Sequence, residues 1–585
     1  MLRTSALTGR LVQRAVAAVV ICVLGCLGCL GDLAGIGQLA PAHAQEAAAD
    51  SEPYDVLIVN GRIVDGSGNP WFHGELAIRG DRIVRVARSI AGAAKHKLDA
   101  NGMVVAPGFI DVHSHSDFLL LEDGAAQSKI RQGVTTEVLG EGSSPGPFGG
   151  KLGPRTVTVQ GEPRKLQTLP DYFQAVEQAG IATNVATYVG LNNVWQHVMG
   201  ESFDRPSADQ LAEMGRLVDE AMQAGALGLS SQVMMPPGSL ATTEEIIALC
   251  KVVRRSHGIY STHIRNEGGG VFESVKEAIE IGRQSGVSVD VIHLKIADER
   301  LWGRMDEVVK LIQDAREEGL NVQANVYPYT RGNNNLASII PPWAHEGGTQ
   351  QLLARLRDPE QRKRLKRDIA SGDIAGWYNH YTAVGSDWSR ILVSGDNRFK
   401  GLTMDRVMAL RTEGKRRTAE ELLDELFDYL IEEGGSVSAV YAHHTEDDMM
   451  LALRQPWCSV GSDGSAYAIE GPLRRGNPHP RNFGAFPRVL GKYVRERPLL
   501  QLEDAVRKMT SLNAAKAGLR GRGTLREGAY ADVVVFDPAA VADRATYTQP
   551  FQYPVGIKHV LVNGELVLAD GEHTGKRPGR ALRRD

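Results

Sequence analysis

The stretch Ala106-Pro-Gly-Phe-Ile-Asp-Val-His-Ser-His-Ser-Asp117 decides the fold of this chain. A Pro-Gly pair interrupts the backbone, and the apolar run at 109–112 that follows predicts a short buried strand. His113 and His115 stand at its end. Because residues i and i+2 of a strand point to the same face, the two imidazoles converge on one point. Neutral imidazole is a common ligand of divalent metals, so the pair is a candidate metal site.

Helix-like and strand-like runs alternate farther along the chain. We expect strands at 184–190, 226–230, 259–263, 287–293 and 322–327, separated by helices at 171–178, 208–225, 244–257, 271–286 and 305–318. Repeated βα units of this number predict an α/β fold with a (β/α)₈ TIM-like barrel. The barrel is expected to resume at 438–442 and 458–461. In such barrels the chemistry lies at the C-terminal ends of the strands.

Both ends of the chain show short apolar alternation broken by turns, at 54–86 and again at 529–537 and 557–564. We therefore expect the termini to meet in one small β-sandwich. Residues 331–435 are rich in charge and helical in pattern, which predicts an inserted subdomain. The expected organisation is a signal peptide at 1–45, β-sandwich at 46–106 and 521–585, metal-dependent hydrolase barrel at 107–330 and 436–520, and the helical insertion at 331–435.

Composition sets broad limits on function. The chain has 585 residues, enough for two or three domains, and its 42% hydrophobic and 23% charged content is ordinary for a globular protein. A net charge of −4 predicts no general affinity for nucleic acid. Three of the five cysteines lie in the leader, and the remaining two do not make a disulfide framework.

The first 45 residues have the pattern of an export signal. Three arginines precede an apolar stretch at 15–30, and Ala42-His-Ala44 before Gln45 is a small-x-small cleavage site. We expect a Sec-type signal peptide cleaved near Ala44 and a periplasmic or secreted protein. Two alternatives remain: a single membrane anchor, and a lipoprotein tethered through Cys26 in Val23-Leu-Gly-Cys26.

Further candidate ligands stand at the ends of other predicted strands. His263 and His293 each end a strand and lie about one βα unit apart, and Asp463 closes another strand. Taken singly, each would be an ordinary structural residue. Together with the first histidine pair they place five candidates on one rim of one barrel, which predicts a metal centre.

The chain resembles a known family at several of these points. Residues 107–115 resemble the barrel opening of the amidohydrolase superfamily, and residues 528–537 resemble its returning β-sandwich strand. Finer motifs are similar to those of the D-aminoacylases, the N-acyl-D-amino-acid deacylases: Arg131-Gln-Gly-Val-Thr-Thr136, Gly225-Ala-Leu-Gly-Leu-Ser230, Pro236-Pro-Gly-Ser239, Thr262-His-Ile-Arg-Asn-Glu267, His293-Leu-Lys295, Val326-Tyr-Pro-Tyr-Thr330, Gly461-Ser-Asp-Gly464 and Pro478-His-Pro-Arg-Asn-Phe-Gly-Ala-Phe-Pro-Arg-Val-Leu-Gly491. The resemblance covers nearly everything from residue 54 to about residue 570.

The resemblance implies a mechanism. His263 and His293 would hold a tightly bound zinc, with a second, weaker divalent metal at His113, His115 and Asp463. Asp463 would take the proton of the attacking water as general base and pass it to the leaving amine as general acid. The free α-carboxylate of the substrate would be bound by three further residues that match the family, Lys295, Tyr327 and Arg481. Arg481 can bind a carboxylate bidentately.

Three departures from the family pattern bear on the site. Gly142 stands where the family has a zinc-binding cysteine, and we expect the adjacent Glu141 to coordinate instead. Glu137 is the alternative, as is a zinc with fewer protein ligands. Met235 replaces a substrate-binding tyrosine, and Asn333 replaces a serine. The last two positions lie at substrate contacts, so the reaction class is better determined than the substrate.

The sequence therefore predicts a metal-dependent hydrolase that cleaves N-acyl-D-amino acids to a carboxylate and a free D-amino acid. Its expected partner is a small-molecule substrate, with no nucleic acid and no membrane beyond a lipid anchor. The alternatives are a dipeptidase acting on peptides with a D-residue, a cyclic-amide hydrolase and, from another class, a non-catalytic binding protein on the same fold.

Overall fold

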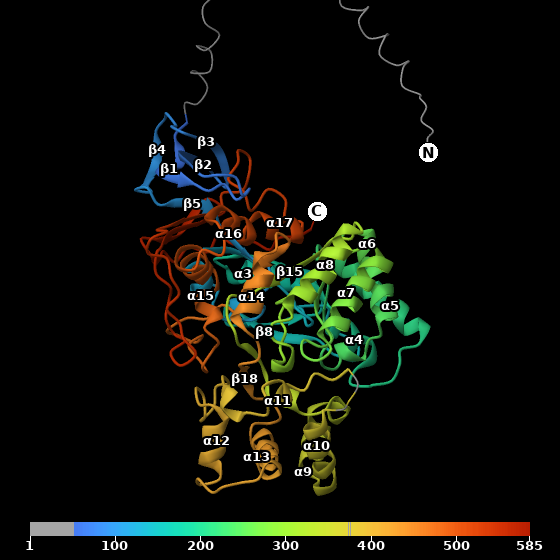
Figure 1. The fold of residues 1–585 in the computed structure, drawn as a ribbon. Coiled ribbons are helices and arrows are strands. Elements are labelled where there is room, and N and C mark those ends of the chain that lie inside the picture. The colour runs from blue at the N-terminus through green and yellow to red at the C-terminus, as the bar shows by residue number, and fades with distance from the viewer. Residues whose placement is uncertain (1–51, 373, 375, 585) are drawn as a thin grey trace, which may run out of the picture. The chain divides into compact units, whose positions relative to one another are not determined.

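A computed structural model describes residues 52–372, 374 and 376–584 of the chain (Figure 1). The expected signal peptide, with its cleavage site near Ala44 and with Cys26, lies outside these residues. Within the described part, no helix is both long enough and apolar enough to cross a membrane. Residues 53–585 form one compact unit.

Eight parallel strand positions make the predicted barrel. In spatial order they are β6 (Phe109–Asp111), β7 (Val134–Leu139), β10 (Asn184–Thr187) with its continuation β11 (Val189–Gly190), β12 (Gly228–Gln232), β13 (Ile259–His263), β14 (Ser288–Val291), β15 (Val322–Val326) and β19 (Cys458–Val460). A parallel bridge between Ser114 and Gly464 joins the ends of β6 and β19 and closes the ring. The α/β barrel expected from the sequence is confirmed.

Helices form the outer layer of the barrel, as Figure 1 shows for α4 (Leu191–Met199), α5 (Ala208–Gln223), α6 (Thr243–Arg255), α7 (Val271–Ser285) and α8 (Met305–Glu317). Side-chain caps fix the starts of two of these helices, whereas α4, α7 and α8 begin without one. Ser207 with Gln210, and Thr242 with Glu245, form reciprocal capping boxes at α5 and α6. Helix α7 begins without a side-chain cap, after Gly268–Gly270. This leaves its first turn open to groups from elsewhere in the fold.

The two ends of the chain meet in one nine-stranded sheet. Its spatial order is β23 (Glu572–His573), β22 (Glu565–Ala569), β21 (Ile557–Val562), β20 (Val533–Phe536), β5 (Val104–Pro107), β1 (Tyr54–Ile63), β2 (Phe72–Arg79) and β3 (Arg82–Ala87), with β4 (Ala94–Asp99) paired to β1. The antiparallel β5–β20 pair, in register at Val105 and Val535, joins the N-terminal and C-terminal parts. The expected union of the two ends is confirmed.

The insertion contains a sheet as well as helices. Strands β16 (Gly332–Asn335) and β17 (Ile391–Val393) flank β18 (Ser438–Tyr441) in an antiparallel sheet. Around it lie α9 (Gly348–Arg357), α10 (Pro359–Ser371), α11 (His380–Ala383), α12 (Met404–Arg411) and α13 (Ala419–Glu432), with an apolar core of their own. Helices α9, α10, α12 and α13 are grouped away from the barrel helices in Figure 1.

The position of β18 corrects the sequence analysis, which placed 438–442 in the barrel. A four-residue apolar run carries no mark of parallel or antiparallel pairing, so its pattern suited either sheet. Its true partners lie about fifty and one hundred residues upstream, in β17 and β16. After the insertion, the barrel is completed by β19 alone.

A buried ion pair ties the first barrel strand to the last. Lys129 Nζ lies 2.7 Å from Asp111 Oδ2 and donates hydrogen bonds to Ser462 Oγ at 2.9 Å and to the Gly464 carbonyl at 2.9 Å. Asp111 Oδ1 accepts from the Ser462 backbone N–H at 2.8 Å. Both charged side chains are fully buried. The network therefore holds the segment after β6 against the segment after β19.

Replacing Lys129 with methionine should lower stability sharply, because it leaves the Asp111 carboxylate buried without its cation. We expect a loss of about 3–5 kcal/mol in the free energy of unfolding. The measurement is the thermal unfolding midpoint of the variant. Lys363→Met, at a side chain that is 70% exposed, is the matched control. Equal midpoints for the two variants would contradict the role given to this pair.

Candidate metal centre

All six residues expected as metal ligands follow or end a barrel strand on the same rim. His113 and His115 follow β6, Glu141 follows β7, His263 ends β13, His293 follows β14 and Asp463 follows β19. Ligand atoms from these side chains gather in two groups that share Glu141. The barrel thus brings together residues that are far apart in sequence.

The first group joins Glu141 to the initial histidine pair and Asp463. Oε2 of Glu141 lies 2.5 Å from His113 Nε2 and 3.0 Å from His115 Nε2. His115 Nε2 is also 3.0 Å from Asp463 Oδ1, while His113 Nε2 is 3.8 Å from it. Four donor atoms therefore face one point.

The second group uses the other oxygen of Glu141. Oε1 lies 3.1 Å from His263 Nδ1 and 3.8 Å from His293 Nε2, and these two nitrogens are 3.0 Å apart. Metal–nitrogen bonds of 2.0–2.1 Å in a tetrahedral site separate neighbouring donor atoms by about 3.4 Å. The observed spacing and the nitrogen and oxygen donors fit a divalent metal. One carboxylate spans both groups.

The local backbone accounts for the glycine where the family has a cysteine. Gly142 has a φ of +60°, and a Cβ built there would lie 2.6 Å from Cβ of Gln232. A side chain at 142 would be strained and crowded, whereas the adjacent Glu141 faces both groups of histidines. Glu137, the alternative ligand, is engaged elsewhere. It accepts hydrogen bonds from Ser114, Ser116 and Thr183.

A carboxylate that the sequence analysis did not assign lies behind two of the histidines. Glu267 Oε1 is 3.0 Å from His293 Nδ1, and Oε2 is 3.5 Å from His263 Nε2. These are the ring nitrogens that face away from Glu141. A carboxylate in this position fixes the tautomer and orientation of a metal-binding histidine. The signal in the sequence was an acidic residue four positions after a candidate ligand.

Charge within the cluster governs the state of its groups. Burial alone would raise the pKa of Asp463, but the nearby Arg481, His113 and His115 hold it below the usual range. Arg481 Nη1 lies 2.7 Å from Asp463 Oδ2. Burial disfavours the charged form of His115, yet Asp463 and Glu141 raise its pKa to about 10. Asp463 is therefore ionised at neutral pH.

Two of the site residues adopt left-handed backbone conformations. The φ of His293 is +40° and that of Asp463 is +50°. Such conformations cost non-glycine residues about 1–2 kcal/mol and persist where the surroundings impose them. His293 N–H donates to Asn325 Oδ1 at 3.0 Å, and Asp463 N–H donates to the His113 carbonyl at 2.9 Å. These bonds aim both side chains at the cluster.

The three residues expected to bind substrate do not all line the same cavity. Arg481 lines a cavity of about 480 Å³ at the cluster, but Lys295 and Tyr327 are not among the described residues that line it. Lys295 Nζ is held by Glu267 Oε1 at 2.6 Å. The Tyr327 ring lies near two cations, with Lys295 Nζ 5.7 Å and the Arg481 guanidinium 4.8 Å from its centroid. Both residues sit behind the cavity wall.

Two residues depart from the family pattern at expected substrate contacts, and they too differ in position. Asn333, on β16 of the insertion, lines the cavity. Met235 is not among the described lining residues and instead packs against an apolar group formed by Met234, Ala297, Tyr378 and Ala383. Of these two residues, Asn333 is therefore the one that faces the cavity at the metal cluster.

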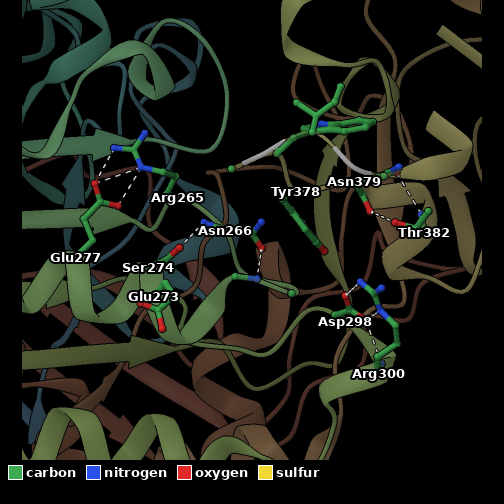
Figure 2. Close-up of a pocket in the computed structure, with 16 residues that line it drawn as sticks. Arg265, Asn266, Glu273, Ser274, Glu277, Asp298, Arg300, Tyr378, Asn379 and Thr382 are labelled. Carbon is green, nitrogen blue, oxygen red and sulfur yellow. Dashed lines mark hydrogen bonds and ion pairs between the residues drawn. The ribbon is translucent and has the colours of Figure 1, made fainter. Parts of the chain in front are cut away.

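A second cavity, of about 440 Å³, lies between the loop after β13 and the insertion (Figure 2). Figure 2 shows Arg265 and Glu277 on one side and Tyr378 and Asn379 on the other. Arg265 is paired with Glu277, and Arg300 with Asp298. Both arginines are thus paired within the cavity, and none of the candidate ligands is among its described lining residues. The chemistry therefore lies in the cavity at the cluster.

The structure is a barrel whose strand ends gather two groups of candidate metal ligands around Glu141, and comparisons with known proteins identify its family. The amidohydrolase family model matches residues 97–324 and 427–568. A D-aminoacylase of Alcaligenes xylosoxydans xylosoxydans is 34% identical over 92% of this chain and 99% of its own length. An N-acyl-D-glutamate deacylase of the same organism is 33% identical over 91% and 97%. The chain belongs to the amidohydrolase family and, within it, to the D-aminoacylases.

Solved structures give the same result. An N-acyl-D-glutamate deacylase from Bordetella bronchiseptica, complexed with zinc and a phosphonate inhibitor, matches with a TM-score of 0.73 and 32% identity, over 91% of this chain and all of that one. A D-aminoacylase matches over the same shares with a TM-score of 0.74 and 32% identity. A further structure concerns the binuclear metal centre of D-aminoacylase. The cluster and these relatives together support a divalent metal at this site.

Glu267→Gln should weaken metal binding, because the amide keeps the shape of the side chain but removes the charge behind His263 and His293. We expect a loss of about 10–100-fold in affinity. It is measured by competition with a chromogenic chelator. Glu273→Gln, at a side chain that is 79% exposed, serves as the control. Unchanged affinity in the Glu267 variant would refute its positioning role.

Proposed function

We propose that the protein hydrolyses the amide bond of N-acyl-D-amino acids to a carboxylate and a free D-amino acid. The observation that carries this proposal is the joined cluster, in which one carboxylate, Glu141, links two histidine pairs beside the ionised Asp463. Every ligand position of the cluster is filled by a side chain able to coordinate, which argues against a non-catalytic binding protein.

We propose zinc as the metal, held tightly by Glu141, His263 and His293, with a weaker second position at His113, His115 and Asp463. A divalent ion there would lower the pKa of a bound water and polarise the scissile carbonyl. Carboxylate is a harder ligand than the thiolate of the family, so metals other than zinc are also expected to bind.

Asp463 is suited to proton transfer by its position and its charge. As the water oxygen bonds to the acyl carbon, the carboxylate takes a proton from that water. The carbon–nitrogen bond then breaks, and Asp463 passes the proton to the departing amine. Its low pKa keeps it ionised as a base, and the ion pair with Arg481 Nη1, 2.7 Å from Asp463 Oδ2, orients it.

Arg481 is the proposed partner of the substrate α-carboxylate. It lines the cavity and is almost fully buried, and its Nε lacks a hydrogen-bond partner. A planar guanidinium can keep one nitrogen on Asp463 while it binds a carboxylate through the others. Lys295 and Tyr327 support it from behind: Tyr327 stacks against the guanidinium, and Lys295 adds positive charge.

Paired N-acetyl-D-amino and N-acetyl-L-amino acids test this function directly on metal-loaded protein. We expect turnover of D-substrates only, and a loss of at least about 100-fold in kcat for Asp463→Asn because the general base is removed. The readout is release of the free amine. A metal-loaded protein that hydrolyses neither enantiomer would refute the proposal, and dipeptides with a D-residue and cyclic amides would then be assayed.

We also propose that the protein is exported, on the strength of the arginine-rich, apolar leader and its small-residue cleavage site. Protein recovered from the periplasm or medium of an expressing bacterium should begin at Gln45 on N-terminal sequencing. An uncleaved Met1 in the membrane fraction would indicate an anchor. A lipid-modified Cys26 at the N-terminus, seen by mass spectrometry, would indicate a lipoprotein, and either result would overturn the proposed cleavage.

A further inference from the structure

The cavity at the metal cluster is walled by neutral polar side chains. Beyond the candidate ligands, its described lining consists of Ser143, Asn192, Gln232, Asn333, Asn334, Asn335, Ser394, Ser438, Ser465, Tyr467, Pro478, His479, Arg481 and Asn482. Within this set Pro478 alone lacks a polar side chain, and Arg481 alone carries a permanent charge. Ligand cavities are ordinarily lined mainly by apolar and aromatic groups. This lining is therefore informative about the ligand.

The insertion contributes a carboxamide that is fixed from behind. Asn333 Oδ1 accepts hydrogen bonds from Ser394 Oγ at 2.8 Å and from Ser438 Oγ at 3.3 Å. The Asn333 side chain makes no other hydrogen bond within the described protein, so its Nδ2 donors are left for a ligand. The neighbouring Asn334 and Asn335 differ, since each carboxamide is engaged at both its oxygen and its nitrogen.

The barrel loops contribute further unused groups. The side-chain carboxamide of Gln232, the last residue of β12, has no hydrogen-bond partner among the described residues. Ser143 Oγ accepts from Asn192 Nδ2 at 3.2 Å, which leaves its own hydroxyl hydrogen to donate. Donors and acceptors from three segments of the fold thus remain open around the cluster.

These groups discriminate between classes of substrate. A polar group that is buried by a ligand without gaining a hydrogen bond loses the bonds it made to water, so an apolar substituent is disfavoured here. An acidic substituent needs a cation, and Arg481 is already paired with Asp463 and assigned to the α-carboxylate. A neutral substituent that both donates and accepts hydrogen bonds can pair with the unused donors and acceptors of the cavity wall.

We infer that the enzyme acts on N-acyl-D-amino acids that carry a neutral hydrogen-bonding group, a carboxamide or hydroxyl, against the wall formed by Asn333, Gln232 and Ser143. The inference rests on the proposed deacylase function and specifies its substrate class. The group can belong to the side chain of the D-residue, as in glutamine, or to a peptide amide within the acyl part.

Two sets of substrates separate these sources. In the side-chain set, N-acetyl-D-glutamine is compared with N-acetyl-D-leucine and N-acetyl-D-glutamate. In the acyl set, N-(acetylglycyl)-D-leucine is compared with N-pentanoyl-D-leucine, which has nearly the same acyl length. We expect kcat/KM to be at least about ten-fold higher, in one set, for the substrate with an amide in addition to the scissile one, the effect of one or two hydrogen bonds.

The variant Asn333→Leu should abolish that preference. The ratio of its kcat/KM on the substrate with the additional amide to its kcat/KM on N-acetyl-D-leucine should fall about ten-fold, and an unchanged thermal unfolding midpoint would show that the variant is folded. Asn69→Leu, at an exposed position in the loop between β1 and β2, is the matched control.

Three results would overturn the inference. N-acetyl-D-leucine or N-acetyl-D-glutamate could be turned over as fast as N-acetyl-D-glutamine, and N-pentanoyl-D-leucine as fast as N-(acetylglycyl)-D-leucine. The Asn333→Leu variant could lose activity equally on every D-substrate, which would place Asn333 on the shared α-carboxylate. With either of these two results, the wild-type protein would still hydrolyse D-substrates, so the proposed deacylase function would be retained. No turnover of any D-substrate by the metal-loaded protein would instead refute both.

Discussion

Closure of the barrel between β6 and β19 is the constraint on which the site depends. It places His115 Nε2 3.0 Å from Asp463 Oδ1, although the two residues are 348 positions apart. The buried Lys129–Asp111 pair and its hydrogen bonds to Ser462 hold the two strand ends together. Breaking such a pair leaves an uncompensated charge, so the stability of the barrel and the geometry of the cluster rest on the same contacts.

Glu141 is the junction of the cluster in this chain. Its two oxygens face different histidine pairs, at 3.0 Å from His115 and at 3.1 Å from His263. A residue next to the family's cysteine position can take this role because Gly142, with a φ of +60°, turns the loop without a side chain. The same loop ends at Ser143, which lines the cavity. One short segment therefore affects both metal binding and substrate binding.

The sequence indicated the barrel and five of the six candidate ligands through local rules, whereas Glu141 was expected from the departure at residue 142 from the family pattern. Two-residue spacing in a strand aims His113 and His115 together, and the barrel places strand ends on one rim. It did not assign a role to Glu267, because burial against two histidines depends on how the loop after β13 folds. Nor did it show that Lys295 lies behind the cavity, held by Glu267. The four-residue strand β18 was misplaced because its pattern suits either sheet.

The position of Glu141 between the two histidine pairs makes it the shared ligand of a single candidate metal centre. Anomalous diffraction from crystals of the zinc-loaded protein would locate the metal and its ligands. We expect zinc bound by His263 and His293 with a Glu141 oxygen at about 2.0–2.2 Å, and no sulfur ligand. Zinc bound by these histidines with the Glu141 carboxylate turned away, beyond coordination distance, would contradict this role of Glu141.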